Sequence, residues 1–199
     1  VMDDHSRLVC HAQWYLSEET DCFVHGFSQA LQKRGLPRAL MSDNGSAYIA
    51  GETEQGLEDL SILHEFILAY SPYQNAKQEN FWAQVEGRLL AMLESVIDLT
   101  LALLNEATLA WIELEYIQKL HSEIGTTPLD RFLKGKSVGR DCPSSEALRN
   151  AFRLKETRRQ RRSDGTVSIS GRRFEVPSRY RHLERLTVRY ARWDLGRID

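Results

Sequence analysis

Two stretches decide the fold of this chain: Leu-Met-Ser-Asp-Asn-Gly at residues 40–45 and Ser-Pro-Tyr-Gln-Asn-Ala-Lys-Gln-Glu-Asn-Phe at residues 71–81. The first predicts a strand that ends at Ser42, because apolar residues lead into Asn-Gly, a pair typical of turns. The second predicts a helix that begins near Asn75, which can cap it after a rigid Ser-Pro corner. One acid, Asp43, therefore leaves a strand end, and another, Glu79, lies in the first turns of a helix, with 35 residues between them.

Asp43 and Glu79 are candidate metal ligands. Carboxylate oxygens are hard ligands of the kind that Mg²⁺ or Mn²⁺ prefers, and a fold can bring distant carboxylates together. Each acid also has an ordinary explanation: an Asp before Asn-Gly is common in turns, and a Glu at a helix start complements the helix dipole. On the residues alone, both interpretations stay open.

The spacing and the flanks of these acids add a family resemblance. Asp43-Asn44-Gly45 and Glu79-Asn80-Phe81 resemble the second and third acids of the DDE transposase and retroviral integrase superfamily, and of bacterial insertion-sequence transposases in particular. Further matches to the end of such a core are Trp111, Tyr116, His121 and Thr126-Thr127-Pro128. The resemblance implies an α/β, ribonuclease-H-like core that cleaves DNA and transfers the strand.

The resemblance also implies a cofactor, partners and roles for single residues. Asp43 and Glu79 would bind two Mg²⁺ or Mn²⁺ ions, and no nucleotide cofactor is implied. Asn44 and Lys77 would contact DNA, although a lysine on a helix surface is equally explained by solvation. The partners would be transposon ends and target DNA, bound by a homo-oligomer.

By the same resemblance, the chain begins inside such a core. Residues 1–7, Val-Met-Asp-Asp-His-Ser-Arg, resemble the Asp-Asp-x-Ser-Arg hairpin of these transposases, whose first catalytic Asp lies on an earlier strand. We therefore expect Asp3 and Asp4 to stabilise a hairpin rather than to bind metal. We also expect this fragment to bind metal weakly and to cut DNA poorly.

Charge divides the chain. Residues 1–130 hold 7 Lys and Arg against 20 Asp and Glu, a balance of −13, whereas residues 131–199 hold 19 against 8, a balance of +11. Such asymmetry favours a polyanion-binding part beside an acidic one, although a merely solvated basic surface is the alternative. The candidates for DNA phosphate contacts are Arg158, Arg159, Arg161 and Arg162.

Periodicity predicts the remaining elements. Strand 8–16, helix 17–34 with Ser17 as its cap, and strand 38–42 would form a βαβ unit. An acidic helix at 52–60 and a buried strand at 62–70 follow, then two long helices and short helices at 128–133 and 144–152. The predicted core stripes of the long helices are Phe81, Val85, Leu89, Met92 and Val96 on the first, and Leu103, Ala107, Trp111, Leu114 and Ile117 on the second.

These elements predict three parts. Residues 1–134 would form an integrase-like catalytic core without its first strand, and residues 135–162 a helical and basic linker. Residues 163–199 alternate apolar and polar side chains around a turn at Ser170-Gly171, which predicts short antiparallel strands. This last part resembles the small β-barrel of Mu-type transposases, and we expect it to be incomplete.

Composition excludes several other classes. The three cysteines, Cys10, Cys22 and Cys142, are scattered and form neither a disulfide framework nor a zinc motif. No apolar run is long enough to span a membrane and no signal peptide opens the sequence, so a cytoplasmic location is expected. Two functions compete with a transposase: a DNA-binding module without chemistry, and a ribonuclease-H-type nuclease.

Overall fold

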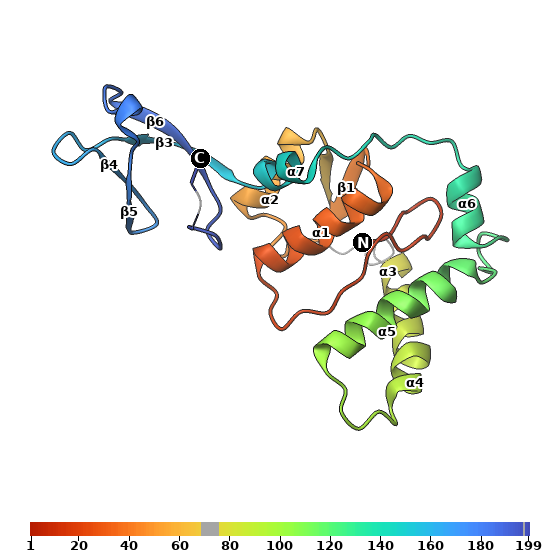
Figure 1. Ribbon diagram of the computed structural model, residues 1–199. Coiled ribbons are helices and arrows are strands. Elements are labelled where there is room, and N and C mark those ends of the chain that lie inside the picture. The colour runs from red at the N-terminus through yellow and green to blue at the C-terminus, as the bar shows by residue number, and fades with distance from the viewer. Residues whose placement is uncertain (69–75, 197) are drawn as a thin grey trace.

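A parallel two-stranded sheet and the helix that joins its strands stand at the centre of the fold. The computed structural model describes residues 1–68, 76–196 and 198–199 (Figure 1). Strand β1 (Ala39–Ser42) pairs in parallel with β2 (Leu63–Phe66), and helix α2 (Gly51–Asp59) connects them. Helices α1 (Thr20–Arg34) and α7 (Ser145–Ala151) pack with α2 around one apolar cluster, which includes Phe27, Leu31, Leu57 and Phe152.

Helix α1 ends where the sequence predicts but begins later. Gly35 follows its last turn with φ at +85°, a backbone conformation that glycine adopts without strain. The predicted cap at Ser17 is wrong: Glu19 holds the N-cap position without a side-chain cap bond, and the Ser17 hydroxyl contacts Cys22 Sγ instead.

The predicted strand at 8–16, and the βαβ unit that it would start, are also wrong. Within the described residues, backbone pairing of this segment is confined to a hairpin with a bridge between Met2 and Val9. Further along, the side chain of Asn105 binds the backbone N–H and C=O of Trp14 at 2.7 and 3.1 Å. A helix side chain thus satisfies groups that a neighbouring strand would otherwise bind.

Strand β2 is shorter and more exposed than predicted. Ile62 is buried, but Leu63 keeps 61% of its surface exposed and Phe66 40%. The prediction of a buried strand is wrong: among the described residues, β2 pairs with β1 alone and so lies at a sheet edge. The last residues of this predicted strand, the Ser71-Pro72 corner and the Asn75 cap lie outside the described residues.

The helix that carries Glu79 contains a π-helical turn. Helix α3 (Ala76–Gln84) continues into the π-helix η2 (Val85–Leu90) and then α4 (Ala91–Leu93). Phe81, Val85 and Leu89 are buried as predicted, but Met92 is 57% exposed. A π-turn holds an extra residue, so the buried face shifts by one position and Leu93 packs on the core instead.

Helix α5 (Leu101–Leu114), followed by the 3₁₀ turn η3 (Tyr116–Gln118), covers α3. Trp111 and Ile117 are buried as predicted, whereas Leu103 and Leu114 are exposed. Their predicted core positions are wrong because α5 buries the face of Thr108, Trp111 and Ile112 and then breaks at Glu115.

The two predicted short helices are confirmed, and each has a side-chain cap. Helix α6 (Pro128–Lys134) is capped by the Thr127 hydroxyl, which accepts the Asp130 N–H at 3.0 Å. Helix α7 is capped in the same way by Ser144. Between them, Arg140 pairs with Leu36 through the backbone, so this connection lies against the end of α1.

The last strands form a separate unit, the β-lobe (residues 154–199); residues 1–153 are the body. Strand β3 (Leu154–Arg159) pairs with β6 (Arg185–Tyr190), and β4 (Thr166–Ile169) pairs with β5 (Arg172–Glu175). The 3₁₀ turn η4 (Ser178–Tyr180) lies between β5 and β6. The predicted turn is confirmed, since Ser170 and Gly171 both have positive φ. A closed barrel is not seen among the described residues, whose β-lobe strands form two-stranded sheets.

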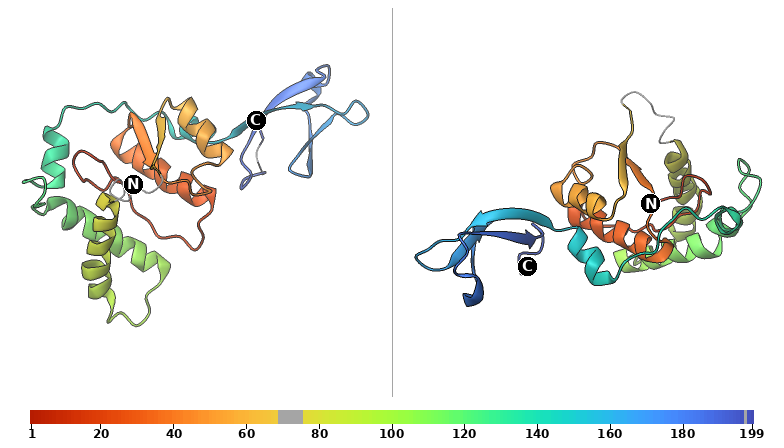
Figure 2. Two further views of the ribbon diagram at one scale, coloured as in Figure 1. Left: turned by 180° about the vertical axis from the view of Figure 1, so that it is seen from behind. Right: turned by 90° about the horizontal axis from the view of Figure 1, so that it is seen from above.

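The β-lobe projects from one side of the body in every view (Figures 1 and 2). It has its own apolar cluster, made of Val167, Ile169, Val176, Val188 and Tyr190. Strand β3, part of the segment predicted as a linker, belongs to this unit through its pairing with β6. No helix in the described ranges is both long and apolar enough to cross a membrane.

Candidate metal and DNA-binding site

Asp43 lies directly after strand β1, at the carboxyl end of the parallel sheet. Its side chain is exposed, and its Oδ1 accepts the Gly45 N–H at 2.9 Å. A β-carbon on Gly45 would lie 3.0 Å from this oxygen and 3.1 Å from the Tyr48 ring, so the turn is fitted to glycine. The sequence therefore predicts the turn correctly, and the turn orients one oxygen of the carboxylate.

Hydrogen bonds within the loop and from helix α2 hold the loop from Asp43 to Ala50. The N–H groups of Tyr48 and Ile49 donate to the Gly45 carbonyl at 2.9 and 3.3 Å. The buried Thr53, in the first turn of α2, donates its hydroxyl to the Ala47 carbonyl at 2.7 Å. Helix α2 thus fixes the loop that carries the candidate ligand.

A serine and a histidine lie beside Asp43. The Ser42 hydroxyl donates to the Asp43 carbonyl at 2.9 Å and lies 2.9 Å from His64 Nε2 on the neighbouring strand. Because the hydroxyl has one proton, this arrangement places a proton on His64 Nε2. Burial lowers the pKa of His64, which favours a neutral ring. No local pattern predicts this pair, since Ser42 and His64 are brought together by the pairing of β1 with β2.

Glu79 lies in the first turn of α3, where its side chain is exposed. Two residues before it, Lys77 Nζ lies 2.6 Å from Asp4 Oδ1, so the N-terminal hairpin packs beside the start of α3 (Figure 2). Lys77, a predicted DNA contact, is therefore ion-paired within the chain. Asp3 stabilises the hairpin, as predicted, by accepting the Ser6 N–H at 2.8 Å.

The hairpin also binds the segment after η3. Arg7 is buried, and its Nη2 lies 2.8 Å from Glu123 Oε1. The Arg7 guanidinium lowers the pKa of Glu123. The hairpin is thus ion-paired both to the start of α3, through Asp4 and Lys77, and to Glu123, through Arg7.

The described side chains supply two candidate carboxylates rather than a complete metal site. Strands β1 and β2 end at the same edge because they are parallel, and nine residues lead from Phe66 to α3. The described part of the chain contains no group of three or more His, Cys, Asp or Glu placed to hold a metal. Two carboxylates still fit Mg²⁺, which is commonly bound by one or two carboxylates together with water and substrate phosphates.

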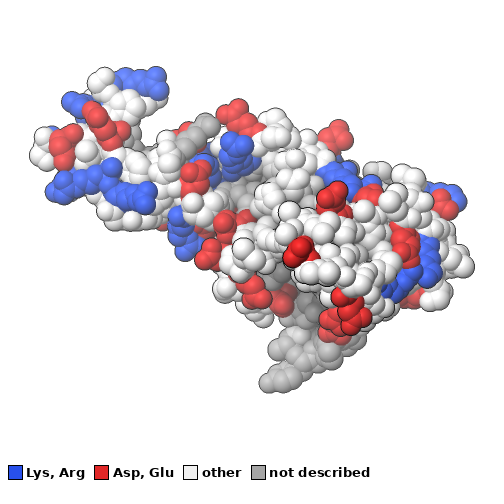
Figure 3. Space-filling model, turned by 60° about the horizontal axis from the view of Figure 1, so that its bottom comes forward, with Lys and Arg blue, Asp and Glu red and all other residues white. Residues whose placement is uncertain are grey.

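The predicted phosphate contacts lie on the β-lobe, where Lys and Arg side chains gather at the outer end of the molecule among some acids (Figure 3). On strand β3, Arg158 is paired with Glu156, and Arg159 Nη2 lies 2.9 Å from Glu184. Exposed pairs of this kind are weak and exchange readily with other anions.

Arg161 and Arg162 are exposed and line a shallow hollow of about 190 Å³. Arg181 and His182 line its other side, together with Asp164 and Glu184. The structure thus places these four predicted arginines on one lobe, away from Asp43 and Glu79.

Glu52 is a buried charge for which the sequence carries no local signal. Its carboxylate is fully buried at the start of α2 and accepts three hydrogen bonds from Arg192, from Nε at 2.7 Å, Nη2 at 2.5 Å and the backbone N–H at 3.2 Å. Burial alone would raise the pKa of Glu52, but the bonds from Arg192 hold it below its ordinary value. The two residues are 140 positions apart. In the sequence alone, Glu52 is explained as an acid that complements the dipole at the start of a helix.

Comparison with known proteins yields a fold and not a family. No protein-family model and no curated protein matches the chain in sequence. Among solved structures, the HTLV-2 integrase catalytic core domain in complex with magnesium is similar at a TM-score of 0.53 and 19% identity, over 66% of this chain and 80% of that one. The BIV integrase catalytic core domain is similar at a TM-score of 0.50 and 21% identity, over 64% of this chain and 82% of that one.

A third similarity extends further along the chain. A chain of the simian T-cell lymphotropic virus intasome in complex with PP2A regulatory subunit B56 gamma matches at a TM-score of 0.60 and 15% identity. The match covers 94% of this chain, and so includes part of the β-lobe, and 60% of the other. The chain therefore has a mixed α/β fold similar to that of integrase catalytic cores.

Proposed function

We propose that the chain is part of a DNA transposase or integrase of the insertion-sequence type, which cleaves DNA and transfers the strand with the help of divalent metal. The observation that carries this proposal is the position of Asp43. It leaves the carboxyl end of a strand in an integrase-like fold, on a turn held by its own carboxylate and by α2. Ligands of open α/β sheets bind at such strand ends.

In this proposal, Asp43 and Glu79 hold Mg²⁺ or Mn²⁺, and two bound ions would activate the attacking oxygen and relieve charge on the leaving oxygen. Asp43 presents an oxygen oriented by Gly45, so little reorganisation is needed on binding. Asn44, exposed beside it, can donate its amide to a phosphate oxygen. Lys77 would exchange its bond with Asp4 for one with DNA.

The β-lobe would bind the phosphate backbone of DNA. Arg158, Arg159, Arg161 and Arg162 offer guanidinium groups, whose geometry matches phosphate oxygens and which set position rather than read sequence. The likeness of the lobe to a Mu-type barrel, a homo-oligomer assembled on DNA and a cytoplasmic location belong to the same proposal.

The test is Mn²⁺- or Mg²⁺-dependent nicking and strand transfer on a labelled duplex. We expect Asp43→Asn and Glu79→Gln each to lower the rate at least about a hundredfold, because each removes a charged metal ligand. Asp98→Asn, a change at an exposed acid of the turn after α4, is the matched control and should leave the rate unchanged. Wild-type rates in both site variants would contradict the proposal.

A DNA-binding module without chemistry is the second candidate, favoured by the basic β-lobe. The same variants discriminate, because they should keep salt-dependent DNA binding while losing strand transfer. Binding with no metal-dependent cleavage in the unaltered chain would favour the module. Cleavage restricted to RNA–DNA hybrids would favour the third alternative, a ribonuclease-H-type nuclease.

A further inference from the structure

An ion pair between the buried carboxylate of Glu52 and the exposed side chain of Arg192 joins the β-lobe to the body. Arg192 follows strand β6, and Glu52 belongs to the first turn of α2. Loss of Arg192 would be costly because it would leave the Glu52 carboxylate without this partner in a poorly solvated place. The contact therefore favours one position of the lobe relative to α2.

Two further ion pairs lie at the same junction. Arg153 Nη2 lies 2.9 Å from Asp194, and Lys155 Nζ lies 2.6 Å from Asp59 at the end of α2. Both ends of α2 are thus tied to the segment around the β-lobe.

Packing sets α2 tightly against the start of the lobe. A β-carbon on Gly56 would lie 2.1 Å from the Phe152 ring, and one on Gly51 would lie 2.9 Å from Leu154. On the other side of Glu52, a hollow of about 580 Å³ opens between α2 and Trp193. Arg192 and Trp193 line this hollow, whereas Ala191 beside them is buried, so the charged contact and packing together hold the Arg192 segment.

A chain of hydrogen bonds leads from this contact to Asp43. Glu52 is followed by Thr53, whose hydroxyl donates to the Ala47 carbonyl at 2.7 Å. The loop then closes on Gly45, which accepts two N–H groups through its carbonyl and donates its own N–H to Asp43. These bonds connect the first turn of α2 to the loop that carries Asp43.

We propose that Arg192, Glu52 and Thr53 are positioning residues, through which the β-lobe holds the loop 43–50 and thereby the Asp43 carboxylate. The lobe then does more than bind phosphate, because it also sets the geometry of the candidate metal ligand. The inference rests on the proposed function only for what Asp43 binds.

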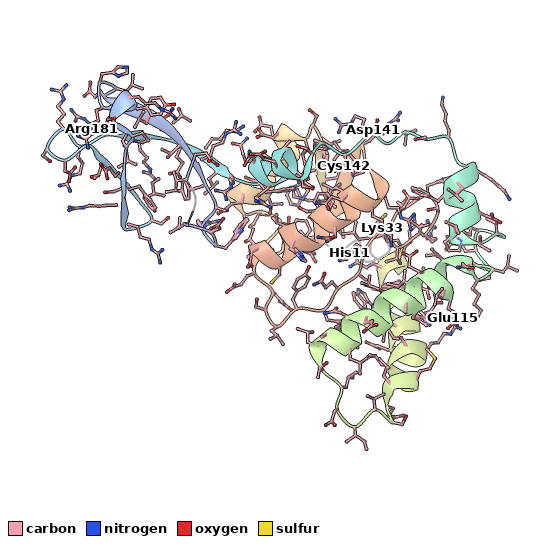
Figure 4. The ribbon with its side chains drawn as sticks, viewed as in Figure 1. His11, Lys33, Glu115, Asp141, Cys142 and Arg181 are labelled. Carbon is pink, nitrogen blue, oxygen red and sulfur yellow. The ribbon has the colours of Figure 1, made fainter. Side chains whose placement is uncertain are left out.

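The experiment is amide hydrogen exchange of the full chain, followed residue by residue by NMR without metal or DNA. In Arg192→Ala and Glu52→Gln, we expect exchange of the Tyr48 and Ile49 amides to rise about tenfold or more, because their bonds to Gly45 open more often. Arg181→Ala is the matched control: Arg181 lies in the outer part of the lobe and pairs with Glu175 (Figure 4). That variant should leave the loop amides unchanged.

Two readouts separate positioning from a general loss of stability. The Gly35 amide, bonded to Leu31 at the end of α1, should keep its exchange rate when the loop amides accelerate. Equal acceleration of Gly35 would overturn the proposal, as would unchanged Tyr48 and Ile49 amides.

A local variant keeps the test decisive if Arg192→Ala does not fold. Thr53→Val removes the hydroxyl at nearly constant shape and should accelerate the loop amides, whereas Thr53→Ser should restore them. Equal exchange rates of the loop amides in Thr53→Val and Thr53→Ser would overturn the proposed role of the Thr53 hydroxyl. The exchange experiment contains no metal, so its failure would not affect the outcome of the nicking test of Asp43 and Glu79.

Discussion

At the scale of the residue, His64 makes the strand end beside Asp43 sensitive to pH. Burial lowers the pKa of His64 in the folded chain, and its Nε2 lies 2.9 Å from Ser42 Oγ. Protonation then favours the unfolded chain, whose histidine keeps the higher pKa near about 6.5. Stability is therefore complete above that pH and falls as the pH drops towards the lower folded pKa.

Urea unfolding at pH 7.5 and pH 5.5 checks this. The wild-type chain should lose more free energy of unfolding between the two pH values than His64→Gln, in which the titrating ring is absent. Equal losses in both proteins would show that His64 does not carry the pH dependence.

Glu52 contributes a second loss of stability with acid, at a lower pH than His64. Its folded pKa is held below its ordinary value, so the charged pair with Arg192 stabilises the fold above about pH 4.3, the pKa of an unperturbed Glu. This stabilisation is lost as the pH falls through the lower folded pKa. We expect acid unfolding of the wild-type chain to be steeper below that pH than acid unfolding of Glu52→Gln, as followed by circular dichroism; identical curves would contradict this.

At the scale of the element, the π-turn η2 decides which side chains of the α3–α4 segment reach the core. Leu89 is buried and Leu93 packs on the same cluster, whereas Met92 is exposed. Leu89→Ala should therefore cost about 2–5 kcal/mol of unfolding free energy. Met92→Ala should change it by no more than about 0.5 kcal/mol.

Leu93→Ala tests the shift itself. In an uninterrupted α-helix, Met92 would follow Leu89 on the buried face, and its loss would cost more than the loss of Leu93. The π-turn predicts the reverse order in chemical denaturation. A larger cost for Met92→Ala would show that the helix is regular in solution.

Local chemistry explains which elements the sequence could predict. The short helices near residues 128–133 and 144–152, the end of α1 before Gly35 and the turn at Ser170-Gly171 depend on neighbouring residues, and all are confirmed. The register of α3–α4 could not be predicted, because an extra residue in a π-turn leaves no local signature. The extended path of residues 10–16 could not either, because it depends on Asn105, which lies 91 positions from Trp14.

The candidate site divides in the same way. Asp43 and Glu79 can be predicted as candidate ligands because each belongs to a short motif with recognisable flanks. Contacts such as Ser42 with His64, Lys77 with Asp4 and Glu52 with Arg192 join residues far apart in the sequence. Only the folded arrangement brings these pairs together, and they bear on the charge and the position of the motif residues.

At the scale of the whole molecule, separate apolar clusters leave the β-lobe as a distinct unit joined to the body by charged pairs. Its exposed arginines should bind DNA by releasing counterions from phosphates. Arg161→Ala and Arg162→Ala should each weaken binding evenly across sequences and reduce the salt slope of log K by about 1. Fluorescence anisotropy from 50 to 200 mM salt measures this, with the body variant Arg38→Ala as control; an unchanged slope would exclude both arginines from the interface.

The central claim is that Asp43 and Glu79 share divalent metal. Crystals of the chain with a short DNA duplex, grown in Mn²⁺, test it most directly through anomalous scattering at the manganese edge. The account predicts an anomalous peak coordinated by both carboxylates, and its loss in crystals of Asp43→Asn. A peak bound to one acid alone, or Asp43 and Glu79 on different faces with no manganese between them, would contradict it.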